Sequence, residues 1–184
     1  MRLAVVVNPD AGLGGRLGFK GSDGRAAEAR AAGAQDRAGP RMRQCLEKLA
    51  ELAREPIEII AWDGRMGGDW IPGNYTSTGV TPDTTDAAST SDFIKSHSPD
   101  LFLYAGGDGT TRGIVEALGD REIPLVGVPG GVKMHSGCFA TTPKAAAEVV
   151  WSFVTGDLMV ARTEVMDLDE EVYRKGEWKV KMYG

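Results

Sequence analysis

Short, uniformly apolar runs that end in glycine-rich turns constrain this chain more than any other feature. Residues 3–7, 101–105 and 124–128 are such runs, and residues 57–62 form a fourth apolar segment. Uninterrupted apolar residues are typical of strands that are buried on both faces of a parallel sheet. Helical patterns separate the runs, so strands and helices alternate. This alternation predicts a doubly wound α/β sheet covered by helices.

Four helices are expected between these strands. Apolar residues recur at helical spacing over residues 40–55, where Pro40 suits the start of a helix. Pro82 and Asp83 are expected to begin a second helix that reaches His97, a third follows residue 109, and residues 143–154 form a fourth. The segment 10–39 is rich in glycine and alanine and is predicted to be a long loop with at most one short helical turn.

Composition excludes several classes of protein. The net charge of −5 argues against nucleic acid as a partner, because such binding depends on neutralising phosphates. No segment approaches the ~20 apolar residues of a membrane span, and the N-terminal apolar run is too short for a signal peptide, so we expect a cytoplasmic protein. Cys45 and Cys138 have no metal-ligand spacing, and both are expected to be packed thiols.

Three glycine-rich turns each follow a predicted strand, at residues 8–24, 106–111 and 129–137. The carboxyl ends of parallel strands lie at one edge of a sheet, where ligands bind, so the three turns are expected to meet. Glycine lets backbone N–H groups approach an anion closely, which suits phosphate. Neither GxxxxGK[ST] nor a helix-opening GxGxxG is present. The alternative for residues 10–39 is a flexible linker.

Asp108 is the sharpest single feature, because it is an acidic side chain between glycines at the end of a predicted strand. Such a carboxylate could take a proton from an attacking hydroxyl or hold Mg²⁺ against phosphate oxygens. It could equally be the N-cap of the helix that begins near Thr110, worth about 1 kcal/mol. The residues alone leave these alternatives open.

Residues 106–110 read GGDGT, which resembles the motif shared by NAD kinases and the diacylglycerol and sphingosine kinases. Residues 8–15 (NPDAGLGG), 17–24 (LGFKGSDG) and 130–136 (GGVKMHS) resemble the predicted ATP- or polyphosphate-dependent NAD kinases. The matches span residues 3 to about 142. The resemblance implies a Rossmann-like three-layer sandwich with a mostly parallel sheet.

The resemblance also implies an activity, the transfer of a phosphate from ATP or polyphosphate to the 2′-hydroxyl of NAD, with Mg²⁺ screening charge. Asp108 matches the family aspartate assigned as base. The expected phosphate- or nucleotide-binding residues are Asn8, Gly12, Gly14, Gly15, Lys20, Asp23, Gly106, Gly107, Gly109, Thr110, Thr111, Lys133, His135 and Ser136. His135 could instead be an ordinary hydrogen-bonding histidine.

The last residues depart from the α/β pattern. Apolar and polar residues alternate over 178–183, as in a half-exposed antiparallel strand, which is expected to pair with residues 162–168 through a turn at Lys175 and Gly176. We therefore expect an α/β domain over residues 1–157 and, over 158–184, a hairpin that begins a truncated or separate β-rich domain. Such an edge invites a second subunit or that missing domain.

Two alternatives to an NAD kinase remain open, because the chain lacks some features of NAD kinases. In NAD kinases a following β-rich domain supplies much of the nucleotide pocket, and the Asn-Glu pair of the classical enzymes is not found after residue 142. The chain could therefore be a nucleotide-binding module or subunit that catalyses nothing alone. It could also be a kinase for another small hydroxyl acceptor, because the third turn differs from that of standard NAD kinases.

Overall fold

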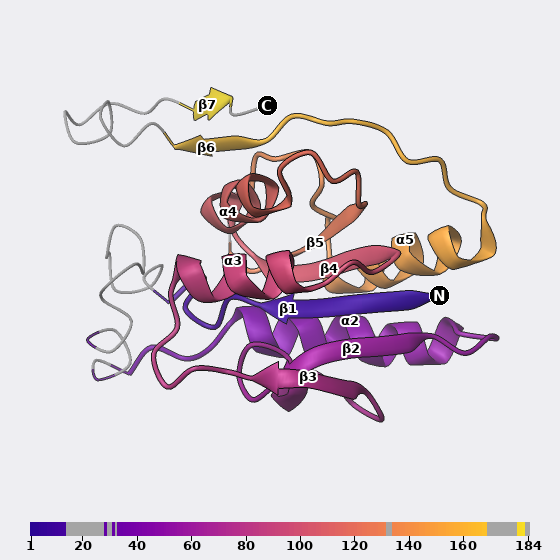
Figure 1. Cartoon of the computed structure of the whole chain (residues 1–184), viewed down its shortest axis with the longest axis horizontal. Coiled ribbons are helices and arrows are strands. Elements are labelled where there is room, and N and C mark those ends of the chain that lie inside the picture. Colours follow the sequence, from indigo (N-terminus) through magenta and orange to yellow (C-terminus); the bar gives the residue numbers. More distant parts are fainter. Residues whose placement is uncertain (14–27, 29–30, 32, 132–133, 169–179, 183–184) are drawn as a thin grey trace.

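The computed structural model describes residues 1–13, 28, 31, 33–131, 134–168 and 180–182. One sheet has the strand order β3-β2-β1-β4-β5 (Figure 1). Its strands are β1 (Arg2–Val7), β2 (Glu58–Asp63), β3 (Thr76–Val80), β4 (Leu101–Gly106) and β5 (Leu125–Pro129). Successive strands are added on one side of β1 and then on the other, so the predicted doubly wound sheet is confirmed. Each of its strand pairings is parallel.

Helices cover both faces of this sheet. α2 (Ala38–Leu52) and α5 (Pro143–Thr155) pack against each other on one face, and α3 (Ala87–Ser96) packs against α4 (Asp108–Leu118) on the other. Side chains of the central strand alternate between the two layers. Leu3, Val5 and Val7 belong to the core beneath α2 and α5, whereas Ala4 and Val6 belong to the core beneath α3 and α4. The three-layer arrangement follows from this alternation.

Aromatic packing holds α3 on the sheet. Phe93 is fully buried, and its ring lies edge-on to Trp62 of β2 and to Phe102 of β4, with centroid separations of 5.5 and 6.4 Å. Burying each phenylalanine stabilises the fold by about 1.5–3 kcal/mol. His97 follows the helix, stacks on Phe93 at 4.4 Å and lies within hydrogen-bond distance of the Thr78 hydroxyl at 2.8 Å. The helix end is thereby tied to β3.

β3 was not predicted, because its sequence lacks an apolar face. Four of its five residues are exposed, and the strand lies at the edge of the sheet beside β2. Edge strands need bury little, so neither an apolar run nor an apolar alternation marks them. No strand was therefore expected between residue 62 and Pro82, where the structure has β3 at Thr76–Val80.

Two helix starts also differ from the prediction. α2 begins at Ala38, two residues before Pro40, and Gly39 in its first turn lies against the indole of Trp70 in a short 3₁₀ helix, η1 (Gly68–Trp70). A side chain at residue 39 would occupy the space of that ring. α3 begins at Ala87 because the Asp86 carboxylate accepts a hydrogen bond from the Ser89 N–H at 2.9 Å. This N-cap, and not Pro82 or Asp83, starts the helix.

A second, two-stranded sheet contains β6 (Met166–Leu168) and β7 (Val180–Met182), which pair antiparallel. Figure 1 shows the chain running from α5 along an extended segment to β6, which lies on the α4 side of the molecule. The antiparallel pairing confirms the expected hairpin, whereas its turn at Lys175 and Gly176 lies outside the described residues. Across the described ranges, no helix is long and apolar enough to cross a membrane.

Candidate functional site

The carboxyl ends of three neighbouring strands form the floor of the site. In the register of the sheet, Val7 of β1 pairs with Ala105 of β4, and Gly106 of β4 pairs with Pro129 of β5. All three strands run in the same direction, so the turns that follow them leave the sheet side by side. This arrangement brings together segments that are about 100 residues apart in the sequence.

Asn8 joins the first turn to the second. Its backbone N–H donates to the Ala105 carbonyl at 2.9 Å, and its side-chain amide donates to the Thr110 hydroxyl oxygen at 2.9 Å. The Asn8 side-chain oxygen accepts from the Asp10 N–H at 3.1 Å, which fixes the orientation of the amide. Thr110 Oγ1 also accepts from the Gly107 N–H at 3.3 Å. Asn8 and Thr110 therefore shape the second turn through contacts with one another.

Glycines let the third turn lie directly against the first two. The Gly130 N–H donates to the Gly106 carbonyl at 2.8 Å, and a Cβ at Gly130 would lie only 2.7 Å from that oxygen. Gly12 has a φ of +81°, and a Cβ there would lie 2.5 Å from the Gly130 carbonyl oxygen. Larger residues at either position would push the turns apart. The predicted meeting of the three turns is confirmed by these contacts, and their role in binding phosphate stays a prediction.

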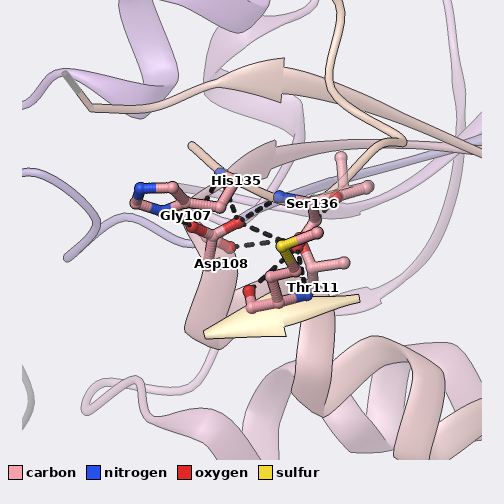
Figure 2. Close-up of polar contacts among 7 residues, drawn as sticks. Gly107, Asp108, Thr111, His135 and Ser136 are labelled. Carbon is pink, nitrogen blue, oxygen red and sulfur yellow. Dashed lines mark hydrogen bonds and ion pairs between the residues drawn. The ribbon is translucent and has the colours of Figure 1, made fainter. Parts of the chain in front are cut away.

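Asp108 lies where the second and third turns meet, with its carboxylate between His135 and Ser136 (Figure 2). The carboxylate is 8% exposed. Its Oδ1 accepts from the Ser136 N–H at 2.9 Å and from the Ser136 hydroxyl at 2.8 Å. Its Oδ2 accepts from the His135 N–H at 2.9 Å and lies 3.0 Å from His135 Nδ1. The third turn thus supplies donors to both oxygens of a buried carboxylate.

These contacts rule out one of the roles considered for Asp108. Gly107 occupies the N-cap position of α4, and Asp108 is the first residue of the helix. The carboxylate is directed to residues 27 and 28 positions later in the chain, and the N-cap interpretation is therefore wrong. The third turn, and not the helix that Asp108 begins, holds the carboxylate in place.

Ser136 connects this carboxylate to β6. Its hydroxyl oxygen lies 3.0 Å from the Met166 carbonyl and accepts from the Met166 N–H at 3.1 Å. A hydroxyl has one hydrogen, and the charged carboxylate of Asp108 at 2.8 Å is the stronger acceptor. The next residue, Gly137, donates its N–H to the Glu164 carbonyl at 3.1 Å. The third turn is therefore fastened to the segment that enters β6.

A buried network lies behind the carboxylate. Thr111 Oγ1 donates to the Gly107 carbonyl at 3.2 Å and lies 2.6 Å from the Tyr104 hydroxyl, which is 3.0 Å from Cys138 Sγ. Burial raises the pKa of Tyr104 well above its ordinary value and also raises the pKa of Cys138. Both groups are consequently neutral near pH 7. The expectation that the two cysteines are packed thiols agrees with the fully buried Cys45 and the half-buried Cys138.

The remaining predicted site residues differ in how deeply they are buried. Thr111 is fully buried, and its hydroxyl lies within this network, so its expected contact with phosphate stays a prediction. Gly109 is exposed at the first turn of α4, whereas Gly106 is buried and Gly107 is half-buried. Five further residues lie outside the described part of the chain: Gly14, Gly15, Lys20, Asp23 and Lys133.

Two arginines at this edge were missed. Arg41 Nη1 donates to the Pro129 carbonyl at 2.7 Å and to the Gly131 carbonyl at 3.3 Å, and the Arg37 side chain lies beside Gly12. Their i, i+4 spacing, at the start of the helix that follows β1, is the pattern that could have indicated them. The Arg41 guanidinium supplies positive charge against the third turn, which favours an anionic ligand.

The described residues do not form a magnesium site of their own. Mg²⁺ prefers carboxylate and other oxygen ligands. Both oxygens of Asp108 face N–H and O–H donors, which would point hydrogens at a cation. Outside the ranges that were left undescribed, no group of three or more His, Cys, Asp or Glu residues is arranged to hold a metal.

Comparison with known proteins gives a family match over most of the chain. Residues 3–158 match the family described as ATP-NAD kinase N-terminal domain. Over 78 residues, or 41% of this chain and 26% of the relative, the sequence is 36% identical to an NAD kinase from Cytophaga hutchinsonii. The chain therefore spans about a quarter of the length of this curated relative.

Among solved structures, a diacylglycerol kinase from Bacillus anthracis strain Sterne is similar over 91% of this chain and 46% of its own, with 16% identity and a TM-score of 0.48. A UDP-GlcNAc 2-epimerase from Neisseria meningitidis covers 70% of this chain and 32% of its own, with 12% identity and a TM-score of 0.36.

Proposed function

Because this chain belongs to the ATP-NAD kinase N-terminal domain family, we propose that it transfers a phosphate from ATP or polyphosphate to the 2′-hydroxyl of NAD. The observation that carries the proposal is the Asp108 carboxylate in the GGDGT turn, 8% exposed and held by donors from the third turn. Phosphoryl transfer needs positioned phosphates, neutralised charge and an acceptor for the hydroxyl proton. An organised carboxylate at the sheet edge supports the last of these.

In this proposal the glycine turns hold the phosphates. The exposed start of α4 at Gly109 offers backbone N–H groups, because the first N–H groups of a helix have no partner within it. Arg41, which donates to the Pro129 and Gly131 carbonyls, adds positive charge next to the third turn. A divalent cation that accompanies ATP would be bound by the phosphate oxygens of the donor, and the proposal requires no metal ligand from the described residues.

The nucleotide pocket is proposed to be completed by further structure next to β6 and β7. The chain spans 26% of the curated NAD kinase, so the substrates of that whole protein are a proposal for this chain. We place a β-rich domain or a second copy of the chain against the two-stranded sheet. Light scattering of the purified chain, alone and with NAD, measures whether a dimer forms.

The proposal is tested by measuring NADP formation with Mg²⁺, NAD and either ATP or polyphosphate. Asp108→Asn should lower turnover by about 10²–10⁴-fold, because the loss of a proton-transfer group has effects of this size. The matched control is Asp120→Asn, which neutralises an exposed carboxylate in the loop after α4. Nucleotide that raises the melting temperature without any product would identify a binding module and contradict the kinase.

A further inference from the structure

One peptide group of the third turn is held at both of its ends. The Pro129 carbonyl accepts a hydrogen bond from Arg41 Nη1 at 2.7 Å. The N–H of the same peptide group belongs to Gly130 and donates to the Gly106 carbonyl at 2.8 Å. Pro129 and Gly130 are buried, and Arg41 is half-buried. The guanidinium on α2 and the last residue of β4 therefore hold opposite ends of a single buried peptide group.

A second peptide group continues this chain of hydrogen bonds into the GGDGT turn. The Gly106 carbonyl shares its peptide group with the Gly107 N–H, which donates to the Thr110 hydroxyl oxygen at 3.3 Å. The chain of hydrogen bonds thus runs from the guanidinium, through two peptide groups, to the turn that carries Asp108. We refer to these two peptide groups, 129–130 and 106–107, as the peptide relay.

The positive charge of Arg41 favours the orientation that both peptide groups have. Each carbonyl of the peptide relay points toward the guanidinium end, so the two peptide dipoles are aligned head to tail. A hydrogen bond from a charged donor is stronger than one between neutral groups. Hydrogen bonds in a row also polarise one another, and a buried environment strengthens each of them. The guanidinium therefore stabilises the whole peptide relay, and not only the carbonyl that it contacts.

The glycine that this close contact requires makes the orientation easy to lose. A Cβ at Gly130 would lie 2.7 Å from the Gly106 carbonyl oxygen, so only glycine fits there. Glycine also permits backbone conformations that other residues avoid, and a peptide group beside it can rotate at little cost. Rotation of this peptide group would break its bonds to Arg41 and to Gly106. The second hydrogen of Nη1 holds the Gly131 carbonyl at 3.3 Å, so Arg41 fixes the turn on both sides of Gly130.

From these contacts we propose that Arg41 is a positioning residue, which acts through the peptide relay to fix the orientation of the peptide group between Gly106 and Gly107. Gly107 is the N-cap of α4 and directly precedes Asp108. The peptide relay therefore sets the direction in which the carboxylate and the first N–H groups of α4 leave the sheet edge. Asp108 keeps its proposed role as the acceptor of the hydroxyl proton. The consequence for turnover rests on the proposed phosphotransfer, whereas the peptide relay itself can be measured without substrates.

Amide hydrogen exchange, followed by NMR on the chain without substrates, tests the peptide relay. Arg41→Ala should make the Gly130 amide exchange at least about tenfold faster, the effect of losing one hydrogen bond from a charged group. The Gly107 amide resonance should shift in the same variant. The amides of Val5 and Leu103, in the centre of the sheet, should keep their wild-type exchange rates.

Arg43→Ala is the matched control for exchange. Arg43 lies on the same helix, and its Nη2 also donates to a backbone carbonyl, that of Asp69 at 2.6 Å, outside the peptide relay. We expect the Gly130 and Gly107 amides to be unchanged in this variant. Wild-type exchange of the Gly130 amide in Arg41→Ala would overturn the proposal. Equally faster exchange at Gly130, Val5 and Leu103 would also overturn it, because Arg41 would then only stabilise the fold.

Turnover tests the positioning role. NADP formation by Arg41→Ala should fall by up to about 10²-fold, the size of effect that a small misplacement near the chemistry can have. Arg41→Lys keeps the charge and a donor and should retain more activity than Arg41→Ala. A low concentration of guanidinium ion should restore part of the activity of Arg41→Ala. Arg43→Ala should have wild-type turnover.

The two measurements separate this proposal from the function on which it rests. Faster exchange at Gly130 together with wild-type turnover in Arg41→Ala would overturn the positioning role and leave the kinase in place. No NADP from the wild type with either donor, together with the local change of exchange in Arg41→Ala, would contradict the kinase and support the peptide relay.

Discussion

The side-chain amide of Asn8 donates to the Thr110 hydroxyl oxygen over 2.9 Å, and this bond joins the turn after β1 to the turn after β4. The same oxygen accepts from the Gly107 N–H, so Thr110 is held from both sides. The conformation of the GGDGT turn therefore depends on a residue 102 positions away in the sequence.

Asn8→Ala should lower the stability of the fold by about 1 kcal/mol, the usual net contribution of one hydrogen bond. For a chain of this size the melting temperature should fall by roughly 2–4 °C. Differential scanning calorimetry measures the change. Asn74→Ala is the control, because Asn74 is exposed in the loop before β3. Equal effects of the two substitutions would contradict a specific role for the Asn8 bond.

Gly12→Ala and Gly33→Ala form a matched pair. Both glycines have positive φ, +81° and +87°, but a Cβ at Gly12 would lie 2.5 Å from the Gly130 carbonyl oxygen, whereas a Cβ at Gly33 would have no atom of the described residues within 4 Å. Backbone strain alone costs about 1–2 kcal/mol in either variant. The free energy of unfolding, measured by urea titration, should fall clearly more in Gly12→Ala, because the added Cβ forces the first and third turns apart. Similar losses of unfolding free energy in the two variants would show that the first and third turns are not in close contact at Gly12.

Ser136→Ala removes the hydroxyl that donates to Asp108 at 2.8 Å. A hydrogen bond to a charged group contributes about 1.5–3 kcal/mol, so the unfolding free energy should fall within that range. Turnover should fall less than in Asp108→Asn, because the carboxylate and both of its backbone donors remain. Ser98→Ala, at an exposed loop position, is expected to leave stability within about 0.5 kcal/mol of the wild type. A variant as stable as the wild type would show that the hydroxyl prefers another partner.

Burial raises the pKa of the Cys45 thiol to about 12. An unfolded thiol ionises near pH ~8.5, so above that pH the unfolded chain releases a proton that the folded chain keeps. The stability contribution is therefore complete below about pH 8.5 and is lost as the pH rises toward 12, by up to about 1.4 kcal/mol per pH unit.

Urea titrations at pH 8 and pH 10 measure this effect. At pH 8 the free energy of unfolding of Cys45→Ala should be lower than that of the wild type. Between pH 8 and pH 10 it should fall by less than that of the wild type. Tyr104 and Cys138, whose pKa values burial also raises, remain in both proteins, so the difference between the proteins isolates Cys45. Equal losses of unfolding free energy in the two proteins would contradict the raised pKa of the Cys45 thiol.

The sheet could be predicted because its central strands are buried on both faces. Uniform apolar runs marked β1, β4 and β5, and the order of strands and helices predicted their winding. β3 carried no such signal, because an exposed edge strand such as Thr76–Val80 buries few side chains. The start of α2 was placed two residues late, because the large apolar side chains that mark the helix begin only at Met42.

The sequence predicted which turns form the candidate site, but not the side-chain contacts within it. Strand direction places all three turns at one edge, and glycine content indicates close backbone approach. The pairing of Asp108 with His135 and Ser136 was not predictable, because local spacing carries no information on contacts across 27 and 28 residues. The same holds for Arg41, whose carbonyl partners lie 88 and 90 residues away.

Ser136 is held by Asp108 on one side and by the backbone of Met166 on the other. A strand outside the main sheet therefore shares a hydroxyl with the buried carboxylate. If β6 moved and took Ser136 with it, Asp108 would lose one of its donors. The hydrogen bonding of the buried carboxylate therefore depends on where this small second sheet lies.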